Sequence, residues 1–235
     1  MKTLAIIPAR GGSKSIPDKN IIEVGGKPLL AWTILAAQNS SNIDRLVVTT
    51  DDPKIAEVAE EYGAEVPFLR PTELAQDDTP GITPIIHAVN WLSANQNYKS
   101  DYVLNLQPTS PLRTGADIDA ALMLATEKIA DGVVSVIQPK HHPYWTQSIN
   151  SEGRMVDFFS QGTNITRRQD LPPAYALNGA IYLVETQVLL SLQTWYTDKT
   201  YAYLMPPERS LDIDTPWDLY LVDLILRNKV EYECN

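Results

Sequence analysis

Short apolar segments alternate with longer helix-like segments along most of this 235-residue chain. Segments with the apolar or β-branched character of strands occur at residues 3–8, 45–50, 101–106, 132–137, 180–184 and 200–205. Helical patterns occur at residues 27–40, 53–63, 83–95, 115–128 and 215–228. Because strands that alternate with helices form parallel sheets covered on both faces, we predict an α/β fold with a mostly parallel, Rossmann-like sheet.

The alternation stops between residues 138 and 178. This stretch is polar, aromatic and punctuated by prolines, and it has no long helical pattern. We therefore expect one domain formed by residues 1–137 and 179–235, interrupted by a small inserted subdomain at residues 138–178. A hydrophobic content of 44% is enough for one sizeable core in a chain of this length.

The charge balance argues against two kinds of partner. With 29 acidic and 19 basic residues the net charge is -10, whereas binding to nucleic acid or to an anionic membrane needs a basic face. The first apolar run is broken by Pro8 and Arg10, so it is too short for a signal peptide. Cys234 is the single cysteine, which excludes an intrachain disulfide. We expect a soluble cytoplasmic protein with no nucleic-acid or membrane partner.

The turn after the first expected strand, "IIPARGGSKSIPDKNII" (6–22), is basic and contains two adjacent glycines. It matches neither the Walker loop nor the spaced glycines of the dinucleotide fingerprint. Glycine at the carboxyl end of a parallel strand, here Gly11, still lets backbone N–H groups approach an anion. Arg10, Lys14 and Lys19 would place positive charge around that anion. The alternative is a solvated loop whose lysines have no role.

A second candidate site lies near the end of the chain, in "SLDIDTPWDL" (210–219). On an extended segment Asp212 and Asp214 point to one face, with Cα atoms about 7 Å apart. Both carboxylates can then hold a divalent cation, expected to be Mg²⁺, that substrate phosphates also bind. The alternative is that Asp214 caps the following helix. Asp117 and Asp119 have the same spacing but lie in the first turn of an expected helix, so we interpret them as structural.

Other polar side chains are expected to be structural. Asp51 and Asp52 follow a strand, and Asp52 is placed to cap the next helix. Asp77 and Asp78 have the character of a loop. His87, on an expected helix, is interpreted as a packing residue.

Six segments together resemble the acylneuraminate cytidylyltransferases, in order and over nearly the whole chain. They are "IPARGGSKSIPDKNI", "TTDD", "PFLRPTELAQD", "LQPTSPLR", "RRQDLPPAYALNGAIY" and "DIDTPWDL". This family comprises the CMP-sialic acid synthetases and their relatives acting on legionaminic and pseudaminic acids. The resemblance implies a nucleotidyltransferase fold and transfer of CMP from CTP to the anomeric hydroxyl of a nine-carbon 2-keto sugar acid, with release of pyrophosphate. It also implies a homodimer joined through the inserted subdomain.

The resemblance assigns roles to individual residues as well. Contacts to the nucleotide and its phosphates would come from Arg10, Gly11, Ser13, Lys14, Lys19 and Asn20, with Arg70 near the base. Gln107, Arg168 and Tyr182 would face the sugar acid, and Asp212 and Asp214 would hold Mg²⁺. Arg10 and Lys19, together with these two aspartates, would be the catalytic residues.

The sugar side of the site leaves alternatives open. The planar guanidinium of Arg168 can donate two parallel hydrogen bonds to the sugar carboxylate, and Arg167 beside it could make the same contact instead. Trp195 and Tyr196 would either line the wall that meets acylamino groups or serve in packing. The family loop usually has glycine at the position of Ser15, where a positive φ would strain the turn. The pattern does not identify which nonulosonic acid is the acceptor.

Three rival functions match parts of the pattern. Enzymes that transfer CMP to 3-deoxy-manno-octulosonate share the early Pro-Ala-Arg but lack the "GGSK" run. A nucleotide-sugar glycosyltransferase would use a D-x-D pair for its metal, but in mid-chain. A non-catalytic sensor of CMP-sugars would not need the metal pair.

Overall fold

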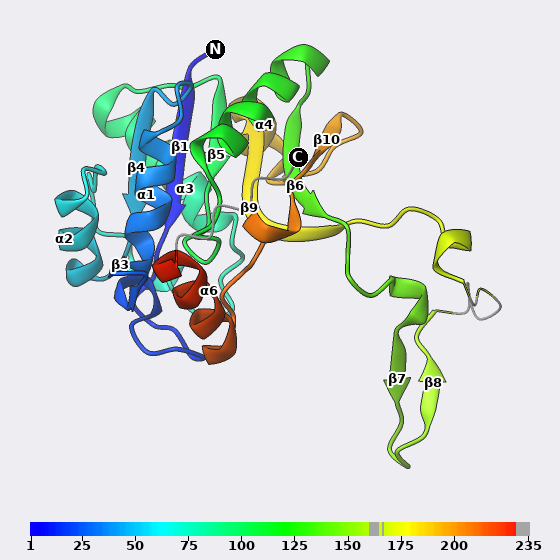
Figure 1. Ribbon diagram of the computed structural model, residues 1–235. Helices are drawn as coiled ribbons and strands as arrows, with labels where there is room; N and C mark the ends of the chain where they lie inside the picture. The colour runs from blue at the N-terminus through cyan, green and yellow to red at the C-terminus, as the bar shows by residue number, and fades with distance from the viewer. Residues whose placement is uncertain (160–164, 166, 229–235) are drawn as a thin grey trace.

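The computed structural model describes residues 1–159, 165 and 167–228, so Cys234 lies outside the described residues. Within these ranges a six-stranded sheet has the order β10-β6-β9-β5-β1-β4 (Figure 1). Its strands are β1 (Thr3–Pro8), β4 (Arg45–Thr49), β5 (Tyr102–Asn105), β6 (Gly132–Ile137), β9 (Ala176–Glu185) and β10 (Thr200–Leu204). The paired strands are parallel except at β9, which is antiparallel to both β5 and β6. The prediction of a mostly parallel sheet is confirmed.

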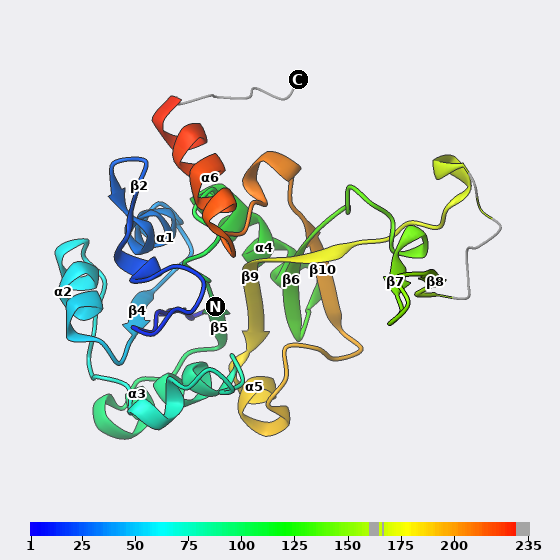
Figure 2. The same cartoon turned by 90° about the horizontal axis from the view of Figure 1, so that it is seen from below.

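Helices cover both faces of the sheet, as expected (Figure 2). They are α1 (Leu29–Gln38), α2 (Pro53–Glu61), α3 (Thr83–Gln96), α4 (Gly115–Lys128), α5 (Thr186–Leu192) and α6 (Pro216–Asn228). Helices α1, α2 and α4 share one buried core with the sheet, whereas α3 and α5 share the core on its other face. Helix α6 packs against the small hairpin of β2 (Glu23–Val24) and β3 (Lys27–Pro28). No helix in the described ranges has the length and apolar character needed to span a membrane.

Local sequence signals explain where the first helices begin and end. Asp52 accepts a 2.8 Å hydrogen bond from the backbone N–H of Lys54, so it caps α2 as expected. Gly63 follows α2 with a φ of 84°, the left-handed conformation that ends many helices. Helix α1 begins two residues later than expected, because Lys27–Pro28 forms strand β3 before the helix starts.

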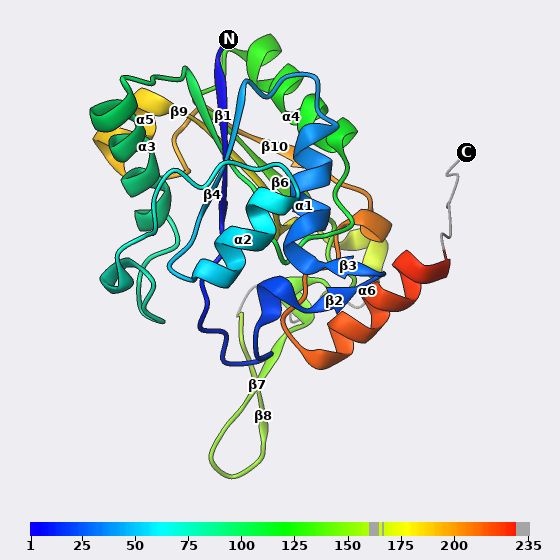
Figure 3. The same ribbon diagram turned by 90° about the vertical axis from the view of Figure 1, so that its left-hand side faces the viewer.

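After β6 the chain leaves the sheet, and the described residues between 138 and 175 extend away from it (Figures 1 and 3). This projecting segment contains a hairpin of β7 (Gln147–Ile149) and β8 (Met155–Asp157), and it returns to the sheet as β9. Strand β9 is longer than the expected strand because its first residues, from Ala176, pair with the end of β6. The assignment of this segment as a separate subdomain stays a prediction.

Candidate active site

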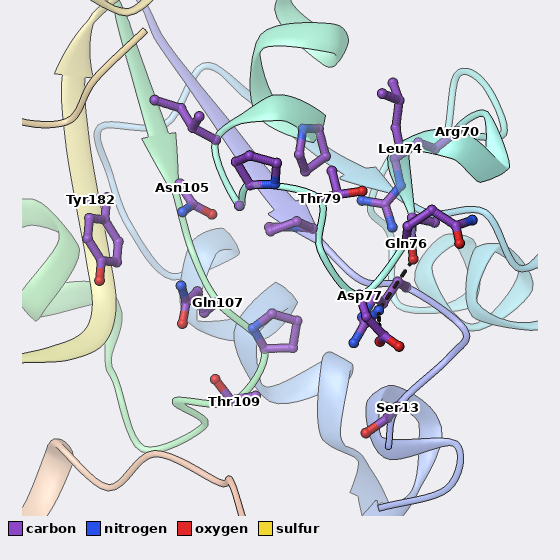
Figure 4. Close-up of a pocket in the computed structure, with 18 of the residues that line it drawn as sticks. Ser13, Arg70, Leu74, Gln76, Asp77, Thr79, Asn105, Gln107, Thr109 and Tyr182 are labelled. Atoms are coloured by element: carbon purple, nitrogen blue, oxygen red, sulfur yellow. Dashed lines mark hydrogen bonds and ion pairs between the residues drawn. The ribbon is translucent and has the colours of Figure 1, made fainter. Parts of the chain in front are cut away.

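A cavity of about 760 Å³ lies at the carboxyl edge of the sheet, between the ends of β1 and β5 (Figure 4). The loop after β1, the chain between residues 70 and 84, the start of the loop after β5, strand β9 and residues 193–196 contribute its lining. Most of the residues assigned to substrates are among the lining residues: Arg10, Ser13, Lys14, Lys19, Asn20, Arg70, Gln107 and Tyr182. Gly11, Arg168, Asp212 and Asp214 are not among them.

Hydrogen bonds fix the start of the loop after β1. Asn20 Nδ2 donates to the backbone carbonyl of Arg10 at 2.9 Å, and the N–H of Gly11 donates to Asp51 Oδ1 at 3.2 Å. A Cβ on Gly11 would lie 2.7 Å from Asp52 Oδ2, so glycine is required for this close approach. The loop is therefore held against the end of β4, and its cations face the cavity.

The strain considered at Ser15 does not arise. The left-handed conformation in this loop is taken by Asp18, with a φ of 50°, and Ser15 is not among the described residues with positive φ. Aspartate tolerates this conformation better than most residues. The turn is thus shaped differently from one that needs glycine at residue 15.

The loop that follows Arg70 supplies an anion to the cationic loop. Asp77 Oδ1 lies 2.6 Å from Arg10 Nη1, and Asp77 Oδ2 lies 2.6 Å from Lys14 Nζ (Figure 4). Hydrogen bonds from Lys14 and then from Arg10 lower the pKa of Asp77. The Asp77 carboxylate therefore bridges Arg10 and Lys14, the two cations expected to meet phosphates. The distance between these two cations thus allows one anionic group to contact both.

Arg70 is buried at the side of the cavity, with 4% of its surface exposed. Burial lowers the pKa of its guanidinium, and the nearby Asp51 carboxylate opposes that effect. Asp51 Oδ1 lies 3.3 Å from Arg70 Nη2, whereas Nε has no hydrogen-bond partner among the described residues. The same oxygen of Asp51 thus contacts both Gly11 and Arg70.

The cationic loop also meets the acidic segment near the end of the chain. Lys19 Nζ donates a 2.8 Å hydrogen bond to the backbone carbonyl of Ile213, between Asp212 and Asp214. The N–H of Ile213 in turn donates to the carbonyl of Thr109, a residue of the cavity wall. The cationic loop after β1 and the segment that carries Asp212 and Asp214 therefore lie together beside one cavity.

Asp212 has the character of a metal ligand. Burial raises the pKa of Asp212, and the Asp214 carboxylate adds to this effect. Its Oδ1 atom is buried without a hydrogen-bond partner among the described residues. A hard divalent cation would satisfy this oxygen. The described residues contain no group of three or more acidic, histidine or cysteine side chains able to hold a metal ion, so a cation here needs further oxygens from a bound phosphate.

Asp214 is exposed and does not cap α6. Thr215 takes that position, because its Oγ1 accepts a 3.3 Å hydrogen bond from the N–H of Asp218. The Asp218 carboxylate completes the capping box by accepting from the N–H of Thr215 at 2.8 Å. The interpretation of Asp214 as the helix cap is therefore wrong, and its carboxylate remains available to share a cation with Asp212.

Neutral polar and aromatic side chains form the other end of the cavity. The ring of Tyr182 lies 5.6 Å from that of Trp195, and both residues line the cavity with Gln107 and Tyr196. Burial raises the pKa of the Tyr182 hydroxyl, so the group stays protonated at neutral pH. Gly179, with a φ of 75°, allows β9 to approach Gln107, since a Cβ there would lie 3.0 Å from its Oε1.

Arg168 lies in a short 3₁₀ helix, Arg168–Asp170, in the projecting segment. Its side chain is exposed and is not among the residues that line the cavity of the same chain. The neighbouring Arg167 is paired with Asp170 at 3.1 Å. The contact of either arginine with a sugar carboxylate stays a prediction.

The carboxylates interpreted as structural on α4 have structural partners. Asp117 forms a capping box with Thr114 and is paired with Arg209 at 2.9 Å. Asp119 accepts a 2.6 Å hydrogen bond from Ser40. These bonds tie α4 to neighbouring segments.

Three polar residues of the site were not assigned to it from the sequence. Asn105 lines the cavity at the end of β5, Asp77 bridges two cations, and Asp51 orients Gly11 and Arg70. The signal available for Asn105 and Asp51 was their place at the carboxyl ends of buried strands, where ligands bind in such sheets. Asp77 carries no comparable signal, because only tertiary structure brings it to the cationic loop.

Comparison with known proteins agrees with this geometry. A family model described as cytidylyltransferase matches residues 4–222. The chain belongs to the cytidylyltransferase family. The resemblance to the acylneuraminate cytidylyltransferases is thereby confirmed, and the chain is a nucleotidyltransferase.

Relatives of this cytidylyltransferase are named for several nonulosonic acids. It is 38% identical over 229 residues to a CMP-N,N'-diacetyllegionaminic acid synthase of Legionella pneumophila, covering 96% of this chain and 97% of the relative. It is 35% identical to a pseudaminic acid cytidylyltransferase of Campylobacter jejuni, over 99% of each chain. An N-acylneuraminate cytidylyltransferase of Streptococcus agalactiae is 37% identical over 92% of this chain, which spans 51% of that relative.

Solved structures with low sequence identity share the fold of this cytidylyltransferase. CMP:2-keto-3-deoxy-manno-octonic acid synthetase complexed with CTP has a TM-score of 0.72 at 17% identity, covering 98% of this chain and all of that chain. A 4-diphosphocytidyl-2C-methyl-D-erythritol synthase of Anaerococcus prevotii has a TM-score of 0.65 at 14% identity, covering 96% of this chain and 98% of that one. These likenesses confirm the nucleotidyltransferase-like fold.

Proposed function

We propose that this cytidylyltransferase transfers CMP from CTP to the anomeric hydroxyl of a nine-carbon 2-keto sugar acid and releases pyrophosphate. The observation that carries the proposal is the hydrogen bond between Lys19 and Ile213, which joins the cationic loop to the Asp212–Asp214 pair beside one cavity. The acceptor class is supported by relatives at 35–38% identity that are named for legionaminic and pseudaminic acids.

The reaction forms a bond from the anomeric oxygen to the α-phosphorus, breaks the bond from that phosphorus to the bridging oxygen of the leaving pyrophosphate, and releases the hydroxyl proton to solvent. Arg10, Lys14 and Lys19 neutralise the triphosphate and stabilise the charge that builds on pyrophosphate. Arg70 contributes a further buried guanidinium on the nucleotide side. Gln107 and Tyr182 position the sugar acid at the opposite end of the cavity.

Asp212 and Asp214 are the proposed ligands of Mg²⁺, because Asp212 has an unpartnered buried oxygen and Asp214 has an exposed carboxylate two residues further along. When bound, the cation supplies positive charge to the phosphates and lowers the pKa of an attached hydroxyl. Chelation with EDTA is expected to abolish pyrophosphate release, and added Mg²⁺ to restore it. Full activity in EDTA would contradict this assignment.

We also propose a homodimer, joined through the projecting segment. Its hairpin exposes large apolar side chains, including Ile149, Met155 and Phe158, which a partner copy would cover. Sedimentation analysis is expected to give a dimer for the wild type and a monomer for Ile149→Asp. A monomeric wild type would contradict this proposal.

A cytoplasmic location is proposed because CTP is an intracellular nucleotide.

A pyrophosphate-release assay tests the function directly. The enzyme is incubated with CTP, Mg²⁺ and each of N-acetylneuraminate, N,N'-diacetyllegionaminate, pseudaminate, deaminated neuraminate and 3-deoxy-manno-octulosonate. One or more of the nine-carbon acids is expected to support release with CTP. Release with none of them would overturn the proposal, and release with 3-deoxy-manno-octulosonate alone would assign the enzyme to the rival acceptor. Parallel reactions with ATP, GTP and UTP test the preference for CTP.

A further inference from the structure

Asn105 lies on the floor of the cavity at the carboxyl end of β5 (Figure 4). It is 4% exposed and pairs in register with Ile6 on β1 and with Tyr182 on β9. Side chains of directly opposed residues on neighbouring strands lie on the same face, with Cβ atoms about 5 Å apart. Asn105 therefore belongs to the same part of the cavity floor as Tyr182.

The side-chain carbonyl of Asn105 is buried without a partner. Its Oδ1 atom has no hydrogen bond among the described residues. Other buried asparagines in this protein are engaged: Asn178 Oδ1 accepts from Ser135 at 2.6 Å, and Asn20 Nδ2 donates to Arg10. An unpaired buried polar atom is destabilising, and at Asn105, which lines the cavity, a bound ligand can supply the missing partner.

The surroundings of Asn105 indicate which part of the ligand it meets. Arg10 and Lys14 come from the loop after β1, and Arg70 comes from the chain between α2 and α3, so the charged phosphates belong on that side. Asn105 is paired with Tyr182 on the opposite side, where the ring of Trp195 packs on the tyrosine. A neutral polar floor beside an aromatic wall suits a neutral substituent with a small apolar group attached.

We propose that Asn105 binds an acylamino group of the sugar acid and makes the enzyme select acids that carry one. A carboxamide side chain complements such a group, since its carbonyl accepts from the acylamino N–H and its NH₂ donates to the acyl carbonyl. The acyl methyl group is then directed toward the aromatic wall. This inference rests on the proposed function, and it assigns acceptor selectivity to a residue of the sheet itself.

Asn105→Leu tests the inference, because leucine has a similar volume and no hydrogen-bonding groups. Wild type and variant are assayed with the best acylamino acid of the panel and with deaminated neuraminate, which carries hydroxyl groups instead. The variant is expected to lose about tenfold of the wild-type preference for the acylamino acid, through a higher KM for that acid. The KM for CTP is expected to stay within about twofold, as for any residue that does not touch the nucleotide.

Two further variants separate binding from folding. Asn105→Ala adds no volume and is expected to shift selectivity in the same direction. Thr3→Val is the matched control, because Thr3 is also fully buried with an unpartnered hydroxyl but lies at the other end of β1. Its kinetic constants are expected to match those of the wild type.

The outcomes distinguish this inference from the proposed function. Unchanged acid preference in both Asn105 variants would overturn the inference and leave the function intact. A raised KM for CTP with an unchanged KM for the acid would also overturn it, by assigning the amide to the nucleotide. A wild type that releases no pyrophosphate with any acid would overturn the function, and the inference with it.

Discussion

Lys19 Nζ donates a 2.8 Å hydrogen bond to the backbone carbonyl of Ile213, a residue 194 positions further along the chain. This bond holds the Lys19 side chain against the segment that carries Asp212 and Asp214. Lys19 also lines the cavity, so its ammonium group is placed to contact a phosphate oxygen there. The bond therefore joins segments from near both ends of the chain beside the cavity.

Lys19→Ala is expected to lower turnover at least about a hundredfold, because a fixed cationic donor to a developing charge contributes on this scale. Pyrophosphate release at saturating CTP and acid measures the effect. Lys54→Ala, which alters an exposed lysine on α2, is the control and should retain full activity. Equal urea midpoints for wild type and Lys19→Ala would show that the fold is intact. A Lys19 variant with more than a tenth of the wild-type activity contradicts the assigned role.

Asp51 is expected to support nucleotide binding without touching the nucleotide. Its Oδ1 contacts both Gly11 and Arg70, so Asp51→Ala frees the loop and leaves a buried guanidinium without its counter-charge. CTP binding measured by calorimetry should weaken at least about tenfold, the scale of a hydrogen bond to a charged group. The KM for the acid should change by less than about twofold.

Two variants control for loss of stability at Asp51. Asp51→Asn keeps an acceptor for Gly11 and removes the charge beside Arg70, so its affinity for CTP should fall between wild type and alanine. Asp119→Asn changes a carboxylate that bonds to Ser40 outside the cavity, and its affinity should be normal. If Asp51→Ala binds CTP as tightly as wild type, the residue has no positioning role.

Much of the fold was predictable because its signals are local. Buried parallel strands require continuous apolar runs, and the cap at Asp52 depends on residues within one helical turn. Strand β9 shows the limit: the apolar run at 180–184 has the same character whichever way the strand points. Its antiparallel direction follows from where the chain re-enters the sheet, because Ala176 at the start of β9 pairs with Ile137 at the end of β6.

The site was predictable where charge and glycine are concentrated in sequence. Arg10 and Lys19 stand in one dense cationic turn, and Asp212 has a second carboxylate, that of Asp214, two residues away. Asp77 was interpreted as a loop residue, since its contact with Arg10 joins segments that no periodicity connects. The position of Asn105 at the end of a buried strand is a weak signal for a ligand site, and its burial without a partner strengthens that signal.

Asp77→Asn is expected to strengthen CTP binding. The carboxylate of Asp77 bridges Arg10 and Lys14, so a triphosphate that takes these cations must displace it. The side chains of Asp77, Arg10 and Lys14 are partly exposed to solvent, which screens their interaction. The gain in affinity for CTP should therefore be modest, up to about fivefold, and smaller at high salt. Calorimetry at two salt concentrations measures it, with Asp78→Asn in the same loop as control. Weaker binding by Asp77→Asn would show instead that this aspartate holds the loop in its nucleotide-binding position.

The ion pair between the buried Asp117 carboxylate and the partly exposed Arg209 predicts a specific dependence of stability on pH. Burial alone would raise the pKa of Asp117, but hydrogen bonds from Arg209 and Thr114 outweigh it and lower the pKa. A carboxyl group whose pKa is lowered on folding adds stability above its unfolded pKa, about 4, and loses it as the pH falls through the folded value. Asp117→Asn should therefore reduce the free energy of unfolding by about 2 kcal/mol at neutral pH, and by progressively less in acid.

Urea denaturation from neutral pH to below pH 4 measures this change in the free energy of unfolding. Glu152→Gln, which breaks an exposed pair on the projecting hairpin, should have almost no effect at any pH. A constant loss for Asp117→Asn across the series would mean that packing, rather than the ionised carboxylate, accounts for the stability.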